Sequence, residues 1–114
     1  MEEPGVIYAA TDSTEVSSPE EGMQRQVLAF NRELMLVRHH LAQGWKGTRH
    51  QHPHHQLVYV VRGRILFDGD GKSVELRAGD SLVVAGKIEH QATALDDSEV
   101  LDVFTPYRED YAPS

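Results

Sequence analysis

The sequence predicts one all-β domain, a jelly-roll barrel with an N-terminal arm. Three observations support this fold class. The chain has 114 residues, which suits a single ordinary domain. Short strand-like runs follow one another, separated by glycine and other turn residues. No window of roughly 11 or more residues shows helical periodicity, and many short strands without helices between them are typical of a sandwich, jelly roll or barrel.

The first segment, residues 1–22, is predicted to be the arm. Residues 10–22 are polar and rich in turn formers, and we expect at most a single helical turn to begin there, at Ser18-Pro19-Glu20-Glu21. The barrel domain is then expected over residues 23–114. The arm would join the barrel without adding to its core.

Eight strands are expected in the barrel domain. Each has the alternating or β-branched pattern of a half-buried strand. Gly63, the hairpin signal Gly69-Asp70-Gly71 and the turn Ala78-Gly79-Asp80 separate several of them. The predicted strands are Arg25–Phe30, Leu34–Leu41, Gln56–Val61, Arg64–Asp68, Lys72–Leu76, Ser81–Val84, His90–Leu95 and Glu99–Phe104.

The composition excludes several function classes. The formal net charge of −7 argues against sequence-independent binding to nucleic acid or to anionic lipid, both of which need a basic surface. No apolar run approaches the ~18 residues of a membrane span. The chain has no cysteine, and Met1-Glu2-Glu3-Pro4 lacks the features of a secretory signal, so a cytoplasmic location is expected. An anionic substrate would need a local cation in a pocket.

Four of the seven histidines lie between positions 50 and 55. In a strand, residues i and i+2 point to the same face, so His50 and His52 would present two imidazoles to one metal ion. Gln56 enters the next strand, and His90 opens a later strand that would supply a third imidazole across the barrel. The alternative is a solvated histidine-rich loop without a metal. The remaining histidines are expected to be exposed or to lie behind the ligands: His39, His40, His54 and His55.

These residues carry a family resemblance. The spacing Gly44-x5-His50-x-His52-x3-Gln56-x6-Gly63 resembles the first signature of the cupin superfamily, except that Gln56 stands where the pattern has Glu. A second run, Gly79-x5-Ala85-x-Lys87-x2-His90, is similar to the second signature, with departures at Ala85, Lys87 and Ala94. The resemblance implies a cupin-type double-stranded β-helix with a metal held by His50, His52, Gln56 and His90.

A glutamine ligand changes the expected chemistry. Three imidazoles and an amide are all neutral, so the charge of a divalent ion would be uncompensated and the ion strongly electrophilic. Such a site suits Zn, Ni, Fe, Mn or Cu, and ligand type alone does not choose among them. We expect one divalent transition metal per chain, with an open position of the kind that catalytic sites keep.

The C-terminal run from Leu101 to Tyr111 supplies the next candidates. Alternation places Asp102 and Phe104 on one face, and a carboxylate within an apolar strand is costly to bury unless a partner or a functional cavity receives it. The alternative is that Asp102 pairs with a cation at the barrel rim or faces solvent. With the histidine run, this segment resembles the KdgF branch of the cupins. That resemblance implies an enzyme of pectin and alginate breakdown, which opens 4,5-unsaturated uronates to a linear keto acid. Asp102, Phe104 and Arg108 would be its working residues.

The resemblance leads to a mechanistic hypothesis. The metal would bind the uronate carboxylate and stabilise charge on the ring oxygen. Asp102 would move the proton between the anomeric hydroxyl and the enol carbon. Arg108 would clamp a carboxylate or hydroxyl in bidentate fashion, and Phe104 would form an apolar wall. Two alternatives stay open: a metal-dependent dioxygenase, and a non-catalytic binding or sensor module. A homodimer formed by strand addition through the arm is also expected, and the alternative is that the arm folds back on its own barrel.

Overall fold

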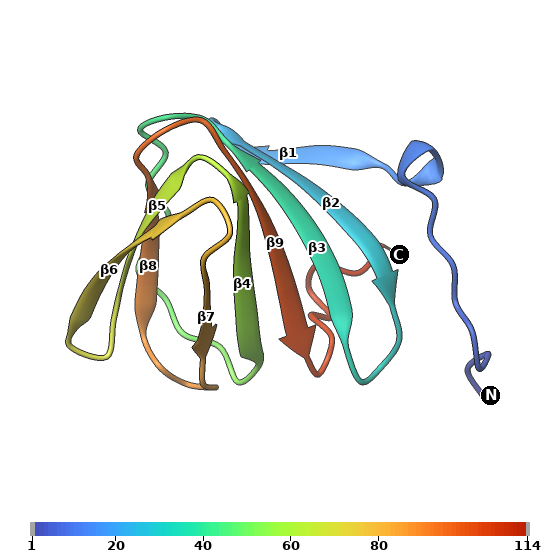
Figure 1. Cartoon of the computed structure of the whole chain (residues 1–114). Helices are drawn as coiled ribbons and strands as arrows, with labels where there is room; N and C mark the ends of the chain where they lie inside the picture. Colours follow the sequence, from blue (N-terminus) through green and yellow to red (C-terminus); the bar gives the residue numbers. More distant parts are fainter. Residues whose placement is uncertain (1, 114) are drawn as a thin grey trace.

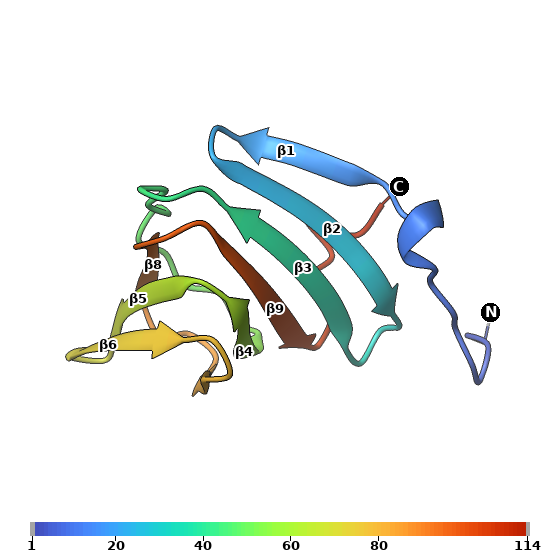
Figure 2. The same ribbon diagram turned by 45° about the horizontal axis from the view of Figure 1, so that its top comes forward.

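The computed structural model describes residues 2–113 and folds almost entirely into strands. Two antiparallel sheets face each other and curve into a barrel (Figure 1). In Figure 2 the top of the molecule is turned towards the viewer. The larger sheet extends to one side, where its first strands lead back to the N-terminal arm. The single helical element in residues 2–113 is the 3-10 turn η1 at Thr11–Ser13, and no helix of this described part could span a membrane.

The larger sheet has six strands in the order β1-β2-β3-β9-β4-β7, and the smaller has the order β6-β5-β8. Strand β9 lies between β3 and β4, so a strand from the end of the chain occupies the middle of the larger sheet. The strands are β1 (Val16–Glu20), β2 (Met23–Phe30), β3 (Met35–Leu41), β4 (His55–Arg62), β5 (Arg64–Gly69), β6 (Lys72–Arg77), β7 (Ser81–Val84), β8 (His90–Ala94) and β9 (Ser98–Thr105).

The predicted all-β jelly-roll class is confirmed, and each of the eight predicted strands is present with its ends within two residues of the expected ones. The helical turn expected at Ser18 is wrong. Residues 16–20 form β1, which pairs with β2 and places a strand inside the segment predicted to be a polar arm. Every side chain of β1 is exposed, so the strand has no buried face to produce an alternating pattern.

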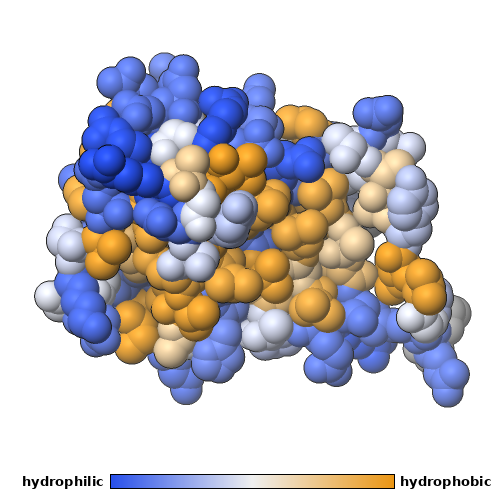
Figure 3. Space-filling model, viewed as in Figure 1, coloured by the Kyte–Doolittle hydropathy of each residue, from blue (hydrophilic) through white to orange (hydrophobic). Residues whose placement is uncertain are grey.

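The outer face of the larger sheet carries exposed apolar side chains. Leu57, Tyr59 and Val61 alternate outward along β4, and Val83 lies beside them on β7. Figure 3 shows apolar residues gathered over this part of the molecule, with polar residues around them. The face is therefore unlike an ordinary solvated surface.

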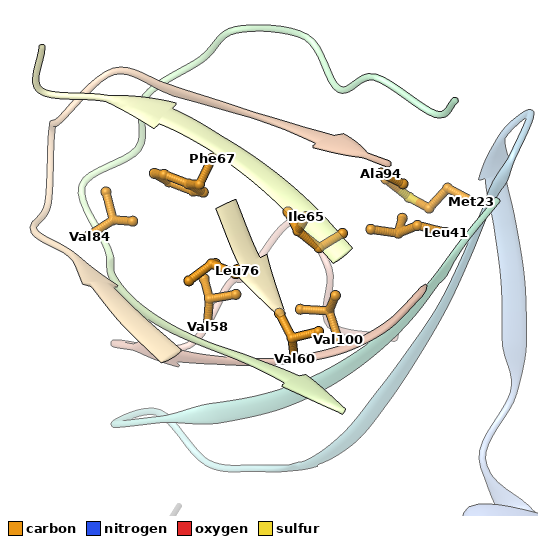
Figure 4. Packing of buried hydrophobic residues seen from close by; sticks show 10 residues of the cluster. All are labelled: Met23, Leu41, Val58, Val60, Ile65, Phe67, Leu76, Val84, Ala94 and Val100. Atoms are coloured by element: carbon orange, nitrogen blue, oxygen red, sulfur yellow. The ribbon is translucent and has the colours of Figure 1, made fainter. Parts of the chain in front are cut away.

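The main core lies between the two sheets. It is built from inward-facing aliphatic residues, among them Val58 and Val60 of β4 and Ile65 of β5, with Phe67 closing one end (Figure 4). A smaller cluster of Met35, Val37 and Phe104 packs beneath the C-terminal segment. Between these clusters the inward faces of β3, β4 and β9 carry polar residues instead, and this interruption is where the site lies.

Candidate metal centre

The histidine run and β8 meet at one rim of the barrel. His50 and His52 lie in the loop between β3 and β4, not in a strand as the alternation argument assumed. Two antiparallel bridges hold the loop, Lys46 to Thr93 and His50 to His90; in the second, His50 N–H donates to His90 O at 3.0 Å and His90 N–H to His50 O at 2.8 Å. The bridges set the loop beside β8 of the smaller sheet, while Gln56 enters from β4 of the larger sheet.

Three imidazoles converge at this rim. One ring nitrogen from each of His50, His52 and His90 lies within 4.8 Å of the others, a separation that one metal ion can bridge. Each Nδ1 is bound to a backbone carbonyl: His50 to Thr48 O at 2.8 Å, His52 to His54 O at 3.0 Å and His90 to Ile88 O at 2.8 Å. Since a carbonyl only accepts, each Nδ1 carries the proton and each Nε2 keeps its lone pair.

The electrostatics of the group also suit a cation. Burial lowers the pKa of His90, and burial together with the positive charge of Arg108 lowers the pKa of His52. Both rings are therefore neutral near pH 7, which is the form that binds a metal. Among the described residues, His90 Nε2 is buried without a hydrogen-bond partner. A metal ion would satisfy this nitrogen, so the residues present fit the predicted ion.

Gln56 lies between the imidazoles and a carboxylate. Its Oε1 is 3.1 Å from His52 Nε2, and its Nε2 donates to Asp102 Oδ1 at 2.8 Å. The amide oxygen is thus the atom turned to the imidazole group, where a ligand would be needed. A glutamate here would bring a second negative oxygen to Asp102. The neighbouring carboxylate gives a physical reason for glutamine at a position where the cupin signature has glutamate.

Asp102 is buried on the inward face of β9 and is 4% exposed. It does not pair with a cation at the rim. Its second oxygen, Oδ2, is 2.7 Å from His39 Nδ1, so each carboxylate oxygen has one side-chain partner. Buried polar groups with both partners in place are held in one orientation.

A cavity of about 110 Å³ joins these groups. His50, His90, Gln56 and Asp102 line it together with apolar residues of the barrel interior. At ~30 Å³ for each water in the liquid, this volume corresponds to roughly four water molecules. A ligand larger than a small organic acid would therefore have to extend out of the cavity.

The C-terminal segment closes one wall of the cavity. The ring of Phe104 is 2% exposed and packs edge-on against His52, at 5.8 Å between ring centroids. Arg108 is buried, with its guanidinium carbon 4.0 Å from the Tyr111 ring centroid. Its Nε and Nη2 donate to Asp110 at 3.0 and 2.8 Å. Asp110 therefore occupies one edge of the guanidinium, and a bidentate contact with substrate would use the other edge, formed by Nη1 and Nη2.

Comparison with known proteins identifies the family. Residues 37–104 match the cupin domain family. The chain is a cupin. It is 31% identical to the pectin degradation protein KdgF of Dickeya dadantii over 106 residues, which cover 91% of this chain and 96% of that protein.

Solved structures agree with the sequence comparison. KdgF from Halomonas sp. superposes with a TM-score of 0.88 and 34% identity, covering 94% of this cupin and 99% of that chain. An RmlC-like cupin from Shewanella frigidimarina gives a TM-score of 0.87 and 36% identity, covering 92% and 95%. The predicted resemblance to cupins and to their KdgF branch is confirmed.

The cupin signature positions have identifiable backbone roles. Gly63 has φ of +90°, and a Cβ there would lie 2.1 Å from Ser98 Oγ, so only glycine fits between β4 and β5. Lys87, where the pattern has glycine, adopts φ of +70°. Its N–H donates to His52 O at 2.7 Å, which keeps the histidine loop against the turn before β8.

The other four histidines lie in different surroundings. None joins the three-histidine group within residues 2–113. His55 is exposed and His40 is half-buried on the outer face of β3. His54 packs beside His52, with ring centroids 5.4 Å apart, and burial lowers its pKa. His39 is buried against Asp102 and lines the same cavity.

Among the cavity-wall residues of this cupin that sequence reasoning missed are Arg25, His39 and Tyr111. Arg25 stacks its guanidinium carbon 3.7 Å from the Tyr111 ring centroid and donates from Nε to His39 Nε2 at 3.0 Å. For His39 a signal existed: Met35, Val37, His39 and Leu41 alternate inward along β3. A histidine in such an apolar row needs a buried partner.

Proposed function

We propose that this cupin opens the ring of 4,5-unsaturated uronates, or of similar small sugar acids, to a linear keto acid with the help of one divalent transition-metal ion. The observation that carries the proposal is the meeting of three imidazoles and the Asp102 carboxylate at one small cavity, joined through Gln56. The similarity to KdgF over nearly the whole chain supports a role in pectin degradation.

The proposed ligands are His50, His52, His90 and the Oε1 atom of Gln56. The free Nε2 lone pairs and the neutral rings are the donors that Zn, Ni, Fe, Mn or Cu accept. A bound ion would supply Lewis-acid stabilisation for negative charge that develops on a substrate oxygen. Proton transfer and substrate orientation would be carried out by side chains of the protein itself.

Asp102 is proposed to carry the proton. Ring opening removes the proton from the anomeric hydroxyl, breaks the bond between the anomeric carbon and the ring oxygen, and forms a carbonyl. The ring oxygen is released as an enolate, which then takes the proton at its carbon and becomes a ketone, so no atom is gained or lost. A single carboxylate fixed in the cavity wall can accept the first proton and donate it in the second step.

The other wall residues are proposed to orient the sugar acid. Phe104 provides an apolar surface against one ring face. Because Asp110 binds Nε and Nη2 of Arg108, the predicted bidentate clamp on substrate would use the other edge of the guanidinium, formed by Nη1 and Nη2. The cavity of about 110 Å³ favours monomeric sugar acids over oligosaccharides.

The test is turnover by the metal-loaded protein with 4,5-unsaturated galacturonate and mannuronate, followed as loss of the absorbance of the conjugated double bond. We expect Asp102→Asn to keep its metal and lose turnover at least a hundredfold. Asp68→Asn, at an exposed carboxylate on β5, is the matched control and is expected to be active. Full turnover by Asp102→Asn would remove Asp102 from the mechanism, and oxygen consumption without uronate loss would favour a dioxygenase.

We also propose that the protein is a homodimer. The apolar outer face with Leu57, Tyr59, Val61 and Val83 supports pairing of two larger sheets, because patches of this kind mark protein contacts. Strand addition would instead use the free edge of β1, since β1 is already paired with β2 on its other side. Tyr59→Lys is expected to give monomers in light scattering if the sheet faces pair, whereas dimers that survive it point to the β1 edge.

A further inference from the structure

A chain of hydrogen bonds extends from the candidate site through the larger sheet to β2. Arg25 and His39 are Cα partners on β2 and β3, and Asp102 lies on the next strand, β9. Arg25 Nε donates to His39 Nε2 at 3.0 Å, and His39 Nδ1 is 2.7 Å from Asp102 Oδ2. His39 is 8% exposed, so water does not compete at its inner nitrogen.

The partners of His39 determine its protonation. Arginine Nε–H only donates, so His39 Nε2 accepts and carries no proton. The proton of the neutral ring is then on Nδ1, which donates to Asp102. A guanidinium on one side and a carboxylate on the other therefore select one tautomer and one ring orientation.

Asp102 receives a donor at each oxygen as a result. His39 Nδ1–H binds Oδ2, and Gln56 Nε2–H binds Oδ1 at 2.8 Å. The two donors come from strands on opposite sides of β9, β3 and β4, so rotation of the carboxylate would break one bond or both. The second bond also fixes which way the Gln56 amide faces, with Oε1 towards His52.

We propose that His39 is a positioning residue for Asp102, and that Arg25 acts behind it by fixing the imidazole tautomer. The role given to Asp102 rests on the proposed function. Tyr111 contributes by holding the Arg25 guanidinium at 3.7 Å from its ring. The proposed effect of His39 passes through the orientation of Asp102 and, beyond it, of Gln56.

The first test requires no turnover. The protein is prepared as the zinc-loaded full chain with ¹⁵N-labelled histidine, and the tautomer of each ring is read from its long-range ¹H–¹⁵N correlations. We expect His39 to be a single Nδ1–H tautomer, and to become a mixture of tautomers in Arg25→Met. An Nε2–H tautomer, a doubly protonated ring, or an unchanged spectrum in Arg25→Met would overturn the proposal.

The second test separates positioning from general damage to the fold. His39→Phe fills the space without a donor, and His39→Asn returns an N–H near the position of Nδ1. With 4,5-unsaturated galacturonate we expect kcat of His39→Phe to fall at least tenfold while KM changes less than threefold. We expect His39→Asn to recover kcat to within about threefold of the wild type. His40→Asn, one residue away on the opposite face of β3, is the control with unchanged kinetics.

Equal losses in His39→Phe and His39→Asn, or a full kcat in His39→Phe, would overturn the positioning role. If the unmodified protein does not turn over unsaturated uronates, the proposed function fails. The tautomer experiment then still decides whether Arg25 and His39 orient the carboxylate, so failure of one proposal is distinguishable from failure of the other.

Discussion

Gln56→Glu provides the sharpest test of how the site is organised. In the metal-free protein this change replaces the amide N–H that donates to Asp102 Oδ1 at 2.8 Å with a carboxylate oxygen. Two carboxylates about 4 Å apart repel by ~4 kcal/mol at an effective dielectric constant of 20. The lost hydrogen bond adds about 1 kcal/mol.

Protonation of the new glutamate limits this cost. Taking up a proton at pH 7 against a reference pKa of 4.3 costs ~3.7 kcal/mol, and the protonated acid can donate to Asp102 again. We therefore expect the free energy of unfolding to fall by about 3–4 kcal/mol at pH 7 and by about 1 kcal/mol at pH 5. The sign follows from linkage: folding raises the pKa of the introduced glutamate, so the loss grows as the pH rises above the unfolded pKa.

The measurement is urea denaturation of the chelator-treated protein at pH 5 and pH 7. Gln24→Glu, at an exposed position on β2, adds the same charge without a neighbouring buried carboxylate and serves as the control. Zinc is expected to close the gap, because the glutamate becomes a charged ligand. A Gln56→Glu protein as stable as the control at pH 7, or a loss independent of pH, would refute the explanation for glutamine at this position.

Three further outcomes concern other parts of the site. His90→Ala is expected to abolish stoichiometric metal binding in elemental analysis, because it removes the third imidazole, and a full metal content would exclude His90 as a ligand. Gly86→Ala places a Cβ 2.3 Å from Pro53 O, so the histidine loop must shift; competition titration should show zinc affinity at least tenfold weaker, and unchanged affinity would show that the loop adapts freely. Hydrogen bonds from Arg108 hold the pKa of Asp110 below its usual range, so its stabilising contribution is present above the unfolded pKa and is lost as the pH falls through the lowered pKa. The difference in urea midpoint between wild type and Asp110→Asn should therefore shrink from pH 7 to pH 3, and a constant difference would contradict this assignment.

Much of the barrel was predictable because its strands have one buried face. The alternation in β3 and β9 is regular enough for the sequence alone to indicate that Asp102 and Phe104 share a face, which is the inward one. Strand β1 was not predicted because none of its side chains is buried and Pro19 lies within it. Its sequence therefore lacks the alternation of a strand with one buried face. Edge strands of this kind carry little pattern.

The candidate site was predictable only where its residues are close in sequence. The spacing of His50 and His52 indicated a paired ligand, although the supporting geometry is a loop bridged to β8 and not a strand. His39 and Asp102 are 63 positions apart, and Arg25 reaches them from a third strand. Such contacts depend on the strand order of the larger sheet, which no local pattern contains.

Metal binding at the three-histidine group would affect how quickly the protein is degraded in a cell. Its rings come from the loop before β4, which belongs to the larger sheet, and from β8 of the smaller sheet. An ion bound there would link the two sheets at the open rim of the barrel. Ligand binding of this kind adds RT ln(1 + [L]/Kd) to the free energy of unfolding. Chains without metal would then open more often and be degraded first, so the abundance of the protein would follow the metal supply and not only the rate of its synthesis.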